Sequence, residues 1–399
     1  MSSSQITLLV TLTGHDRPGV TSRLFSDLAA HDLAVLDVEQ VVIRGHLVLG
    51  VLLACPDSAD LTRIHRQVSA LAADLGMNAE ITMGSGEQAR RPRGRLHVTV
   101  LGNPLLPHVI AAIADRIAAG GANIDRIGRL ARKPVTCIEF EVSGADPQVL
   151  RTALARESAG LGVDIAVQPG GLHRRAMRLV VMDVDSTLLQ DEAIDLLAER
   201  AGHGEEVAKL TAAAMRGEID YAEALRQRVA LFAGMDAAAL DDLIGRLRLA
   251  PGARTLVRTL KRLGYRCGVV SGGFSQVTDW LTDELGLDYA AANTLEIADG
   301  RLTGRITGDL IDRPGKERML RTFAASAGVP LSQTVAVGDG ANDLDMIAAA
   351  GLGVAFNAKP AVRQVADASL SVPNLDAILF LLGISREDVE AADAADQAG

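Results

Sequence analysis

Residues 179–187 read LVVMDVDST, and this stretch decides the fold of the larger part of the chain. An apolar run of strand-like length ends in two carboxylates, Asp183 and Asp185, and two hydroxyl residues follow. Residues i and i+2 of an extended segment point to the same side. If the strand continues through Asp185, both acids leave the sheet at its carboxyl end, where open α/β sheets bind ligands. An isolated pair of this kind is more often a solvated loop, so its meaning depends on the sequence downstream.

Further polar segments are predicted at the same edge of the sheet. Strand candidates span residues 178–184, 265–270, 333–337, 352–356 and 369–372, and the helical runs between them predict a doubly wound, mostly parallel α/β sheet within residues 177–399. Two of these strands end in polar clusters, Ser271-Gly272-Gly273 and residues 338–343 (GDGAND). Lys316 opens a helix after Arg313-Pro314-Gly315. Because parallel strands share one carboxyl edge, these groups converge on Asp183, which favours an active site over a loop.

The two carboxylates are suited to attack on phosphorus. An Asp is ionised near neutral pH and needs no base to activate it. Asp183 lies nearer the strand, so we assign it as the nucleophile that forms an aspartyl-phosphate. Asp185 is then placed to protonate the leaving oxygen and later to deprotonate the attacking water.

A phosphate dianion beside two carboxylates needs cations. Asp339, with Asp183 and the backbone carbonyl of Asp185, offers the hard oxygen ligands that suit Mg²⁺. Lys316 and the Ser271 hydroxyl can hold the remaining phosphate oxygens. Asp343 is expected to orient Lys316 or metal-bound water.

The ordered set D-x-D-S-T, S-G, G-K and G-D-x-x-N-D resembles the haloacid dehalogenase superfamily of aspartyl-phosphate enzymes, across about 220 residues. Ion-pumping members of that superfamily carry a Thr where this chain has Asp185. An acid at this position should speed hydrolysis of the phosphoenzyme, so the resemblance implies a phosphatase.

The chain between Thr187 and Pro251 is far longer than a crossover needs and reads as a helical cap at about residues 190–250. Such a cap would exclude water and select the substrate. Taken singly, Glu192 and Arg228 would be solvated helix charges. As a pair facing a phosphate site they suit a small zwitterion, with Glu192 on an ammonium and Arg228 on a carboxylate.

Here the resemblance narrows to the phosphoserine phosphatase family, through D-V-D-S-T-L followed by Glu192, and M-R-G-E followed by R-Q-R-V at residues 226–229. It implies Mg²⁺-dependent hydrolysis of O-phospho-L-serine, the last step of serine biosynthesis. It also implies substrate contacts at Glu192, Arg228, Ser271, Gly272, Lys316 and Asn342. Three alternatives stay open: another small phosphomonoester, phosphoryl transfer to an alcohol, and a non-catalytic amino-acid sensor.

The first 168 residues contain a repeat. Gly14 and Gly102 are 88 positions apart, as are Asp37 and Asp125. Each copy shows a β-α-β-β-α-β order, which predicts two α+β ferredoxin-like domains at residues 1–86 and 92–168, with residues 84–95 as the linker. Residues 169–171 (PGG) read as a hinge before the α/β part.

The two copies resemble ACT domains, which bind amino acids at the first strand–helix loop. A glycine at a helix start lets backbone N–H groups approach a carboxylate, so the candidate regulatory residues are Asp16, Gly19 and Gly102. Copy two has Pro107 at the offset of Gly19, and Pro18-Gly19 is equally well explained as a turn. The resemblance implies a homodimer with L-serine as effector.

Composition excludes other classes. A net charge of −10 does not favour binding to nucleic acid or to an anionic membrane, and 3% aromatic residues offer few side chains for stacking on bases. No apolar run reaches the length of a membrane span, and the three cysteines lie in separate apolar runs. We therefore expect a cytoplasmic protein with reduced thiols. The acidic, alanine-rich tail after Arg386 is expected to be frayed helix or disorder, without a role.

Overall fold

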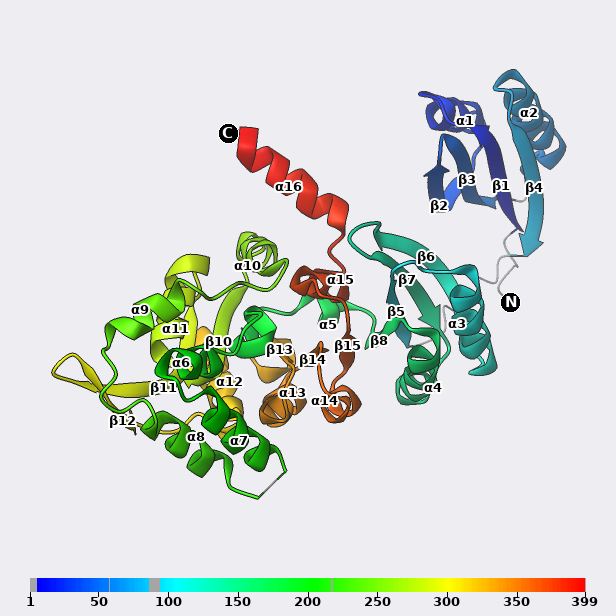
Figure 1. The fold of residues 1–399 in the computed structure, drawn as a ribbon. Helices are drawn as coiled ribbons and strands as arrows, with labels where there is room; N and C mark the ends of the chain where they lie inside the picture. The colour runs from blue at the N-terminus through cyan, green and yellow to red at the C-terminus, as the bar shows by residue number, and fades with distance from the viewer. Residues whose placement is uncertain (1–5, 57, 86–93, 217, 399) are drawn as a thin grey trace. The chain divides into compact units, whose positions relative to one another are not determined.

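The computed structural model describes residues 6–56, 58–85, 94–216 and 218–398 (Figure 1). Contacts divide the chain into two compact units, residues 1–91 and 92–399, and each is considered by itself. Most of the expected linker, residues 86–93, lies outside the described residues.

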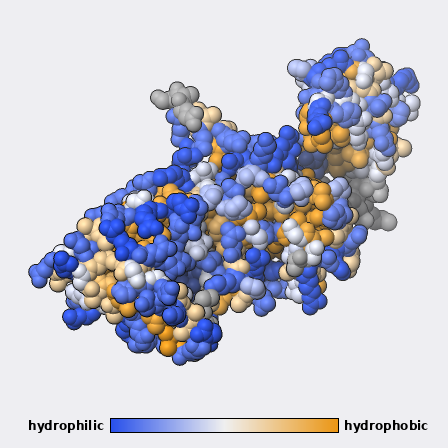
Figure 2. All heavy atoms as spheres, viewed as in Figure 1, coloured by the Kyte–Doolittle hydropathy of each residue, from blue (hydrophilic) through white to orange (hydrophobic). Residues whose placement is uncertain are grey.

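The first unit is one four-stranded antiparallel sheet in the order β2-β3-β1-β4, with two helices. Its elements are β1 Ile6–His15, α1 Val20–Leu28, β2 Ala34–Ile43, β3 His46–Cys55, α2 Leu61–Asp74 and β4 Asn78–Ser85. Positive φ angles at Arg44 and Gly45 make the two-residue hairpin turn expected there. All ten residues of the edge strand β2 are exposed, although most are aliphatic, and Figure 2 shows apolar side chains gathered on the surface of this unit.

The second unit begins with the same topology, a sheet in the order β6-β7-β5-β8. Its elements are β5 Arg95–Gly102, α3 Pro107–Ala119, β6 Asn123–Ala131, β7 Thr136–Ser143, α4 Pro147–Leu161 and β8 Asp164–Pro169. The predicted repeat of a ferredoxin-like module is thus present in the fold.

A seven-stranded sheet follows, in the order β12-β11-β10-β9-β13-β14-β15, parallel except for β11–β12. Its strands are β9 Leu179–Met182, β10 Arg266–Phe274, β11 Tyr289–Ala298, β12 Arg301–Thr307, β13 Thr334–Gly338, β14 Leu352–Phe356 and β15 Ala368–Leu370. Every residue of β9, at the centre, is buried. Leu179 and Val181 join one hydrophobic core while Val180 and Met182 join the other, so both faces of the sheet are covered, as the unbroken apolar run predicts.

Helices form the two covering layers (Figure 1). The core containing Val180 receives α10 Ala253–Arg262, α11 Ser275–Leu285 and α15 Ile378–Leu381, and the other receives α12 Arg313–Ala327, α13 Leu344–Ala349 and α14 Pro360–Val365. The cap is helical as predicted: α6 Ala193–Ala201, α7 Gly204–Met215, α8 Tyr221–Ala230 and α9 Ala238–Ile244.

The antiparallel hairpin β11–β12 was not predicted. Its turn, Asp299-Gly300, has positive φ at both residues, and this dipeptide between two strands is the signal that would have revealed it. The hairpin packs on the cap, because Gly234 N donates to Leu302 O at 2.8 Å.

The expectation of a hinge at residues 169–171 is wrong, because the second module and the α/β part form one compact unit. Gly170 N donates to Arg95 O at 2.6 Å, and α5 Leu172–Arg175 follows at once. Arg151 on α4 pairs with Asp367 at 2.8 Å, and Ser371 N donates to Asp164 at 2.6 Å. These contacts seat the second module on the α/β domain.

The acidic tail is also different from expectation. It forms α16 Arg386–Ala398, and its acids pair with basic residues outside the helix. Asp393 lies 2.5 Å from both Arg258 and Arg262 of α10, and Glu387 lies 3.1 Å from Arg129 of β6. Acidic residues in both halves of α16 therefore pair with β6 and α10, and composition alone does not reveal such contacts.

Arg174 joins the second module to the α/β domain. Its side chain is 8% exposed, donates to the carbonyls of Phe380 and Leu381 at 2.9 Å, and pairs with Glu139 of β7 at 2.5 Å. Burial alone would raise the pKa of Glu139, but His97 and Arg174 outweigh it and lower that pKa.

We expect Arg174→Ala to cost about 3–5 kcal/mol of unfolding free energy, because it removes the buried charge partner of Glu139 and the donor to the Leu381 carbonyl. Urea unfolding of the full chain measures this. Arg175→Ala, at the exposed neighbouring position, is the matched control and should change stability by less than about 0.5 kcal/mol. Equal effects of the two substitutions would contradict the role of Arg174.

Cys55, Cys137 and Cys267 are buried and unpaired, as expected. Among the residues that the structure describes, no helix is both long and apolar enough to cross a membrane.

Candidate active site

The predicted site residues of the α/β domain lie at the carboxyl ends of β9, β10 and β13 and at the start of α12. Asp183 follows β9, Ser271 and Gly272 lie near the end of β10, and Asp339 follows β13. Lys316 is in the first turn of α12, where Asp312 caps the helix by accepting from Gly315 N at 2.7 Å. Strand ends far apart in sequence therefore meet at one edge of the sheet.

Lys316 lies between two carboxylates at the centre of the site. Its Nζ is 2.5 Å from Asp183 Oδ1 and 2.6 Å from Asp343 Oδ1, and all three residues are buried. Burial alone would lower the pKa of Lys316, but Asp183 and Asp343 outweigh it and raise that pKa. Burial and the charge of Asp343 raise the pKa of Asp183. The lysine is thus held as a cation beside two buried carboxylates.

Asp185 faces a different set of partners. Its Oδ1 accepts from Ala193 N at 2.8 Å, at the start of the cap helix α6, and its Oδ2 accepts from Ser271 Oγ at 3.1 Å. Burial raises the pKa of Asp185. A raised pKa suits a group that must carry a proton in part of a reaction cycle.

The strand does not continue through Asp185 as predicted; β9 ends at Met182. The chain then turns tightly over Val184–Leu188, with Ser186 in the left-handed region at φ 58°. Asp183 N still donates to Val337 O at 2.8 Å, so the first acid stays fixed to the sheet. This turn is why the two acids have separate partners.

Three carboxylates could hold a cation. Oxygens of Asp183, Asp339 and Asp343 lie within 4.8 Å of one another. Burial and Asp343 raise the pKa of Asp339 to about 6, the response of an acid that lacks a sufficient counter-charge. Both Asp343 oxygens already have donors, Lys316 Nζ at 2.6 Å and Gly340 N at 2.9 Å. In the described part of the chain, Asp183 and Asp339 each accept a hydrogen bond on Oδ1 only, from Lys316 and Thr187, so their Oδ2 atoms fit the role of ligands to a hard divalent cation.

Glycines let the loops approach closely. A Cβ on Gly338 would lie 2.4 Å from Asp343 Cγ, so only glycine leaves room for that buried acid. A Cβ on Gly272 would lie 2.2 Å from the Tyr221 hydroxyl, which reaches this loop from the cap. Tyr221 was not predicted; a tyrosine at the first position of a cap helix carries no distinctive sequence signal. Asn342 lies beside Gly340 in the same turn as Asp343.

The two cap charges are placed differently from each other. Glu192 precedes α6 and accepts from Ser186 Oγ at 2.8 Å. Arg228 on α8 is buried, and its guanidinium donates hydrogen bonds to two neutral acceptors, Ala224 O and Thr211 Oγ1, both at 3.3 Å. Among the described residues its guanidinium forms no ion pair at close range, although Asp195 on α6 is near enough for the two charges to interact. A buried guanidinium in this state is prepared for an anion from outside the chain.

The profile of haloacid dehalogenase-like hydrolases matches residues 180–348, and ACT domain profiles match residues 6–82 and 96–168. The chain is 61% identical over 397 residues to phosphoserine phosphatase of Streptomyces coelicolor, covering 98% of this chain and 97% of that protein. The chain belongs to the phosphoserine phosphatase family.

Other relatives agree with this assignment. Phosphoserine phosphatase SerB2 of Mycobacterium tuberculosis is 52% identical over 396 residues, which cover 98% of this chain and 97% of that protein. The unliganded crystal structure of a probable phosphoserine phosphatase from Vibrio cholerae is similar with a TM-score of 0.58 at 32% identity, covering 76% of this chain and 91% of that one. The predicted fold, a haloacid dehalogenase-like domain after two ACT domains, is confirmed, and the protein is a hydrolase.

In this member of the phosphoserine phosphatase family, the regulatory candidates lie in unlike surroundings. Gly19 precedes α1 with φ 95°, and Asp16 is exposed, with its N–H donating to Gly45 O at 2.8 Å. Gly102 is buried against Val163 and Leu105, so copy two has no open glycine there.

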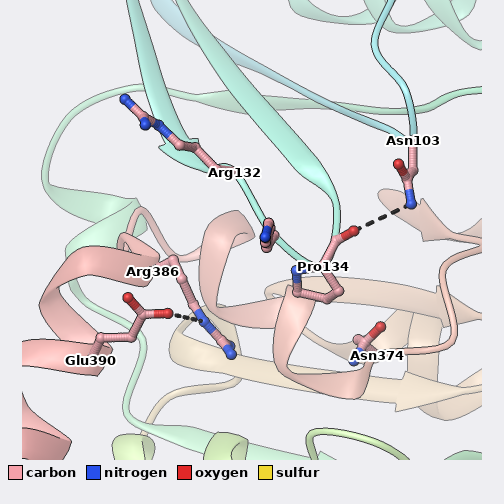
Figure 3. Close-up of a pocket in the computed structure, with 7 residues that line it drawn as sticks. Asn103, Arg132, Pro134, Asn374, Arg386 and Glu390 are labelled. Atoms are coloured by element: carbon pink, nitrogen blue, oxygen red, sulfur yellow. Dashed lines mark hydrogen bonds and ion pairs between the residues drawn. The ribbon is translucent and has the colours of Figure 1, made fainter. Parts of the chain in front are cut away.

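A cavity of about 600 Å³ instead opens beside the next residue, Asn103 (Figure 3). It is lined by loops of the second module and by the α/β domain: Asn103, Arg132, Lys133, Pro134, Asn374, Arg386 and Glu390. Asn103 Nδ2 donates to Pro134 O at 3.3 Å, and Arg386 lies 3.1 Å from Glu390 (Figure 3). The loop end of copy two therefore faces the α/β domain.

Proposed function

We propose that the protein hydrolyses O-phospho-L-serine to L-serine and phosphate through an aspartyl-phosphate on Asp183. The observation that carries the choice of substrate is the buried Arg228 guanidinium, which belongs to the cap and forms no close ion pair among the described residues, although its charge interacts at longer range with Asp195. A substrate carboxylate would complete that charge, and Glu192 would take the ammonium. The names of the two relatives that match over nearly the whole chain support the same substrate.

The first chemical step uses two acids. Asp183 Oδ attacks phosphorus and the bond to the serine oxygen breaks, while Asp185 delivers a proton to that oxygen. In the second step Asp185 removes a proton from water as the water attacks the phosphoenzyme, which releases phosphate and frees Asp183. The separate surroundings of the two carboxylates support this division, because only Asp185 is clear of the Lys316 ion pair.

Charge on the phosphoryl group is balanced by fixed groups. Lys316 is held by Asp183 and Asp343 and would contact a phosphoryl oxygen, with Ser271 Oγ and the backbone at Gly272 on its other side. Asn342 would contact the same group from the β13 loop. A Mg²⁺ ion held by Asp183, Asp339 and the carbonyl of Asp185 would neutralise negative charge and so assist attack by an anionic nucleophile.

A panel of phosphomonoesters tests the substrate. We expect phosphate release from phosphoserine in the presence of Mg²⁺, with much lower kcat/KM for phosphoethanolamine, which lacks the carboxylate that Arg228 would bind. Arg228→Lys should lower kcat/KM for phosphoserine but hardly change it for phosphoethanolamine. Equal rates on both compounds would remove the proposed substrate, and phosphate transfer to added homoserine would favour a phosphotransferase.

The KM for phosphoserine should rise as pH falls below 7. Glu192 is an exposed residue, but partial desolvation of its carboxylate and the charge of Asp185 raise its pKa to about 7. Protonated Glu192 cannot pair with the ammonium, so KM should increase by up to about tenfold per pH unit. The matched compound is 3-phospholactate, which carries a hydroxyl in place of the amine and shares the titration of the phosphate. Identical pH profiles of KM for the two compounds would contradict the role of Glu192.

We propose L-serine as an effector of the ACT domains, bound by Asp16 and Gly19 in copy one or beside Gly102 in the cavity of copy two. The left-handed Gly19 before α1 and the basic lining of the cavity support binding of a carboxylate. Calorimetric titration of serine into the full chain, with Asp16→Ala and Asn103→Ala as site variants, tests this; absence of heat at about millimolar serine would remove it.

We also propose a homodimer. The edge strand β2 has six exposed aliphatic side chains: Val35, Leu36, Val38, Val41, Val42 and Ile43. An exposed apolar edge strand of this kind is a surface for pairing with another chain. Sedimentation of the wild type and of Val41→Lys would test it, because a charge on this strand should shift the protein toward monomer.

A further inference from the structure

Asn293 is a buried amide between the two loops that are proposed to bind phosphate. It lies on β11 and is 0% exposed. Its Nδ2 donates to Gly272 O at 2.8 Å, and its Oδ1 accepts from Ile311 N at 2.8 Å. A carbonyl can only accept and a backbone N–H can only donate, so these partners fix the orientation of the amide.

The first loop needs this partner. The parallel register of β10 and β11 is interrupted between Val270 and Phe274, where Ser271–Gly273 bulge from the ladder. Gly272 is half-buried in this bulge, and the loss of a hydrogen bond to its carbonyl would cost about 1–3 kcal/mol. The same loop carries Ser271, whose Oγ donates to Asp185 and accepts from Gly273 N at 2.8 Å.

The second loop leads directly to Lys316. Ile311 is followed by Asp312, the residue that caps α12. Asp312 accepts from Gly315 N through its side chain at 2.7 Å and from Lys316 N through its carbonyl at 2.8 Å. The contact of Asn293 with Ile311 therefore lies five residues from the lysine that pairs with Asp183.

We infer that Asn293 is a positioning residue that holds the Ser271–Gly273 loop and the start of α12 at a fixed position relative to each other. Ser271, Gly272 and Lys316 can then contact the same phosphoryl group. The inference rests on the proposed function. Asn293 touches neither the substrate nor the reacting atoms in this role, and it acts through the peptide at Gly272.

Asn293→Asp separates this role from simple packing. Aspartate has nearly the shape of asparagine and can still accept from Ile311 N. Its ionised carboxylate, however, has no proton to donate to the Gly272 carbonyl and would repel that oxygen. The protonated form could donate to that carbonyl and restore the contact. At pH 8 we expect phosphoserine KM and the inhibition constant of orthovanadate each to be raised about tenfold, the effect of one lost hydrogen bond. Both values should return toward wild type as pH falls to 5.5.

Gln333→Glu is the matched control, because it also turns an amide into a carboxylate in the α/β domain, at a half-buried position before the amino end of β13 and away from these loops. It should follow the wild-type pH profile. An Asn293→Asp profile parallel to wild type, or a loss of melting temperature with unchanged KM and orthovanadate inhibition, would overturn the inference. If this variant does not fold, Asn293→Ala, which adds no charge, decides by calorimetry of inorganic phosphate: about tenfold weaker binding supports the role and equal binding overturns it.

The substrate assignment and the positioning role of Asn293 are tested by different measurements. If the wild type released no phosphate from phosphoserine, the substrate assignment would fall. The comparison of inorganic phosphate binding between wild type and Asn293→Ala would still test the positioning role.

Discussion

Asp183→Asn is expected to lower kcat for phosphoserine by about four to six orders of magnitude, the scale of losing a covalent nucleophile. An amide is neutral and a far weaker nucleophile toward phosphorus than a carboxylate. Stability should be retained or improved. The amide still accepts a hydrogen bond from Lys316, and it replaces a carboxylate whose ionised form is disfavoured by burial, as the raised pKa of Asp183 shows. Activity and thermal unfolding measured on the same preparation separate catalysis from folding.

The control for this variant is Asp191→Asn. Asp191 lies on the same segment but pairs with Arg248 through two hydrogen bonds, at 2.7 and 3.2 Å. We expect its kcat to stay within about twofold of wild type, as for a surface ion pair. Near wild-type turnover by Asp183→Asn would refute the nucleophile assignment.

Lys316→Met should have the second largest effect, and it should act on both stability and activity. Removing the ammonium leaves Asp183 and Asp343 buried without the cation that lies between them, and Asp339 close by. The expected cost in chelator is about 3–5 kcal/mol of unfolding free energy, the range for breaking a buried ion pair. We expect kcat/KM to fall by about 10³-fold or more, because a charge aimed at the phosphoryl group is lost.

The sign of the pH dependence is a further check on Lys316→Met. Protonation removes the repulsion between the carboxylates, so the stability loss should be larger at pH 8 than at pH 5. Added Mg²⁺ should recover part of it at pH 8, because the cation replaces the missing charge. Lys209→Met, at an exposed position on α7, is the control and should leave both properties unchanged. A Lys316→Met protein as stable as wild type in chelator would contradict the buried triad.

The location of the polar residues at one edge of the sheet could be predicted from the sequence, because parallel strands have their carboxyl ends at the same edge. Once Asp183, Ser271 and Asp339 are placed after apolar runs, topology alone brings them together. The repeat in the first 168 residues was recoverable for a similar reason, since a constant offset between Gly14 and Gly102 preserves element order.

Other features depend on tertiary contacts that no local pattern encodes. The sharp turn at Ser186 ends β9 early and gives Asp183 and Asp185 different partners, although their spacing predicts a common side. The tail is helical because Arg258 and Arg262, more than a hundred residues earlier, hold its acids. Asn293 and Tyr221 escaped notice because a single Asn in a strand or Tyr in a helix has no distinctive spacing.

The contacts of Arg174 tie the second ACT domain to the α/β domain, so the two should not be separated for binding measurements. A fragment ending at residue 168 would lack Arg174, the buried partner of Glu139 on β7, and Asp367, the partner of Arg151 on α4. Division near residue 91 follows the compact units instead. Serine binding is therefore best measured on the full chain.

The most direct test of the account is chemical trapping of the phosphoenzyme. Wild type and Asp185→Asn would be mixed with phosphoserine and Mg²⁺, quenched in acid at short times, and treated with borohydride, which reduces an acyl-phosphate to an alcohol. Peptide mass spectrometry then locates the reduced residue. We predict homoserine in place of Asp183, at higher occupancy in Asp185→Asn than in wild type if water attack is slowed more than phosphoryl transfer to Asp183. Phosphate release without any reduced product at residue 183 in either protein would contradict the mechanism.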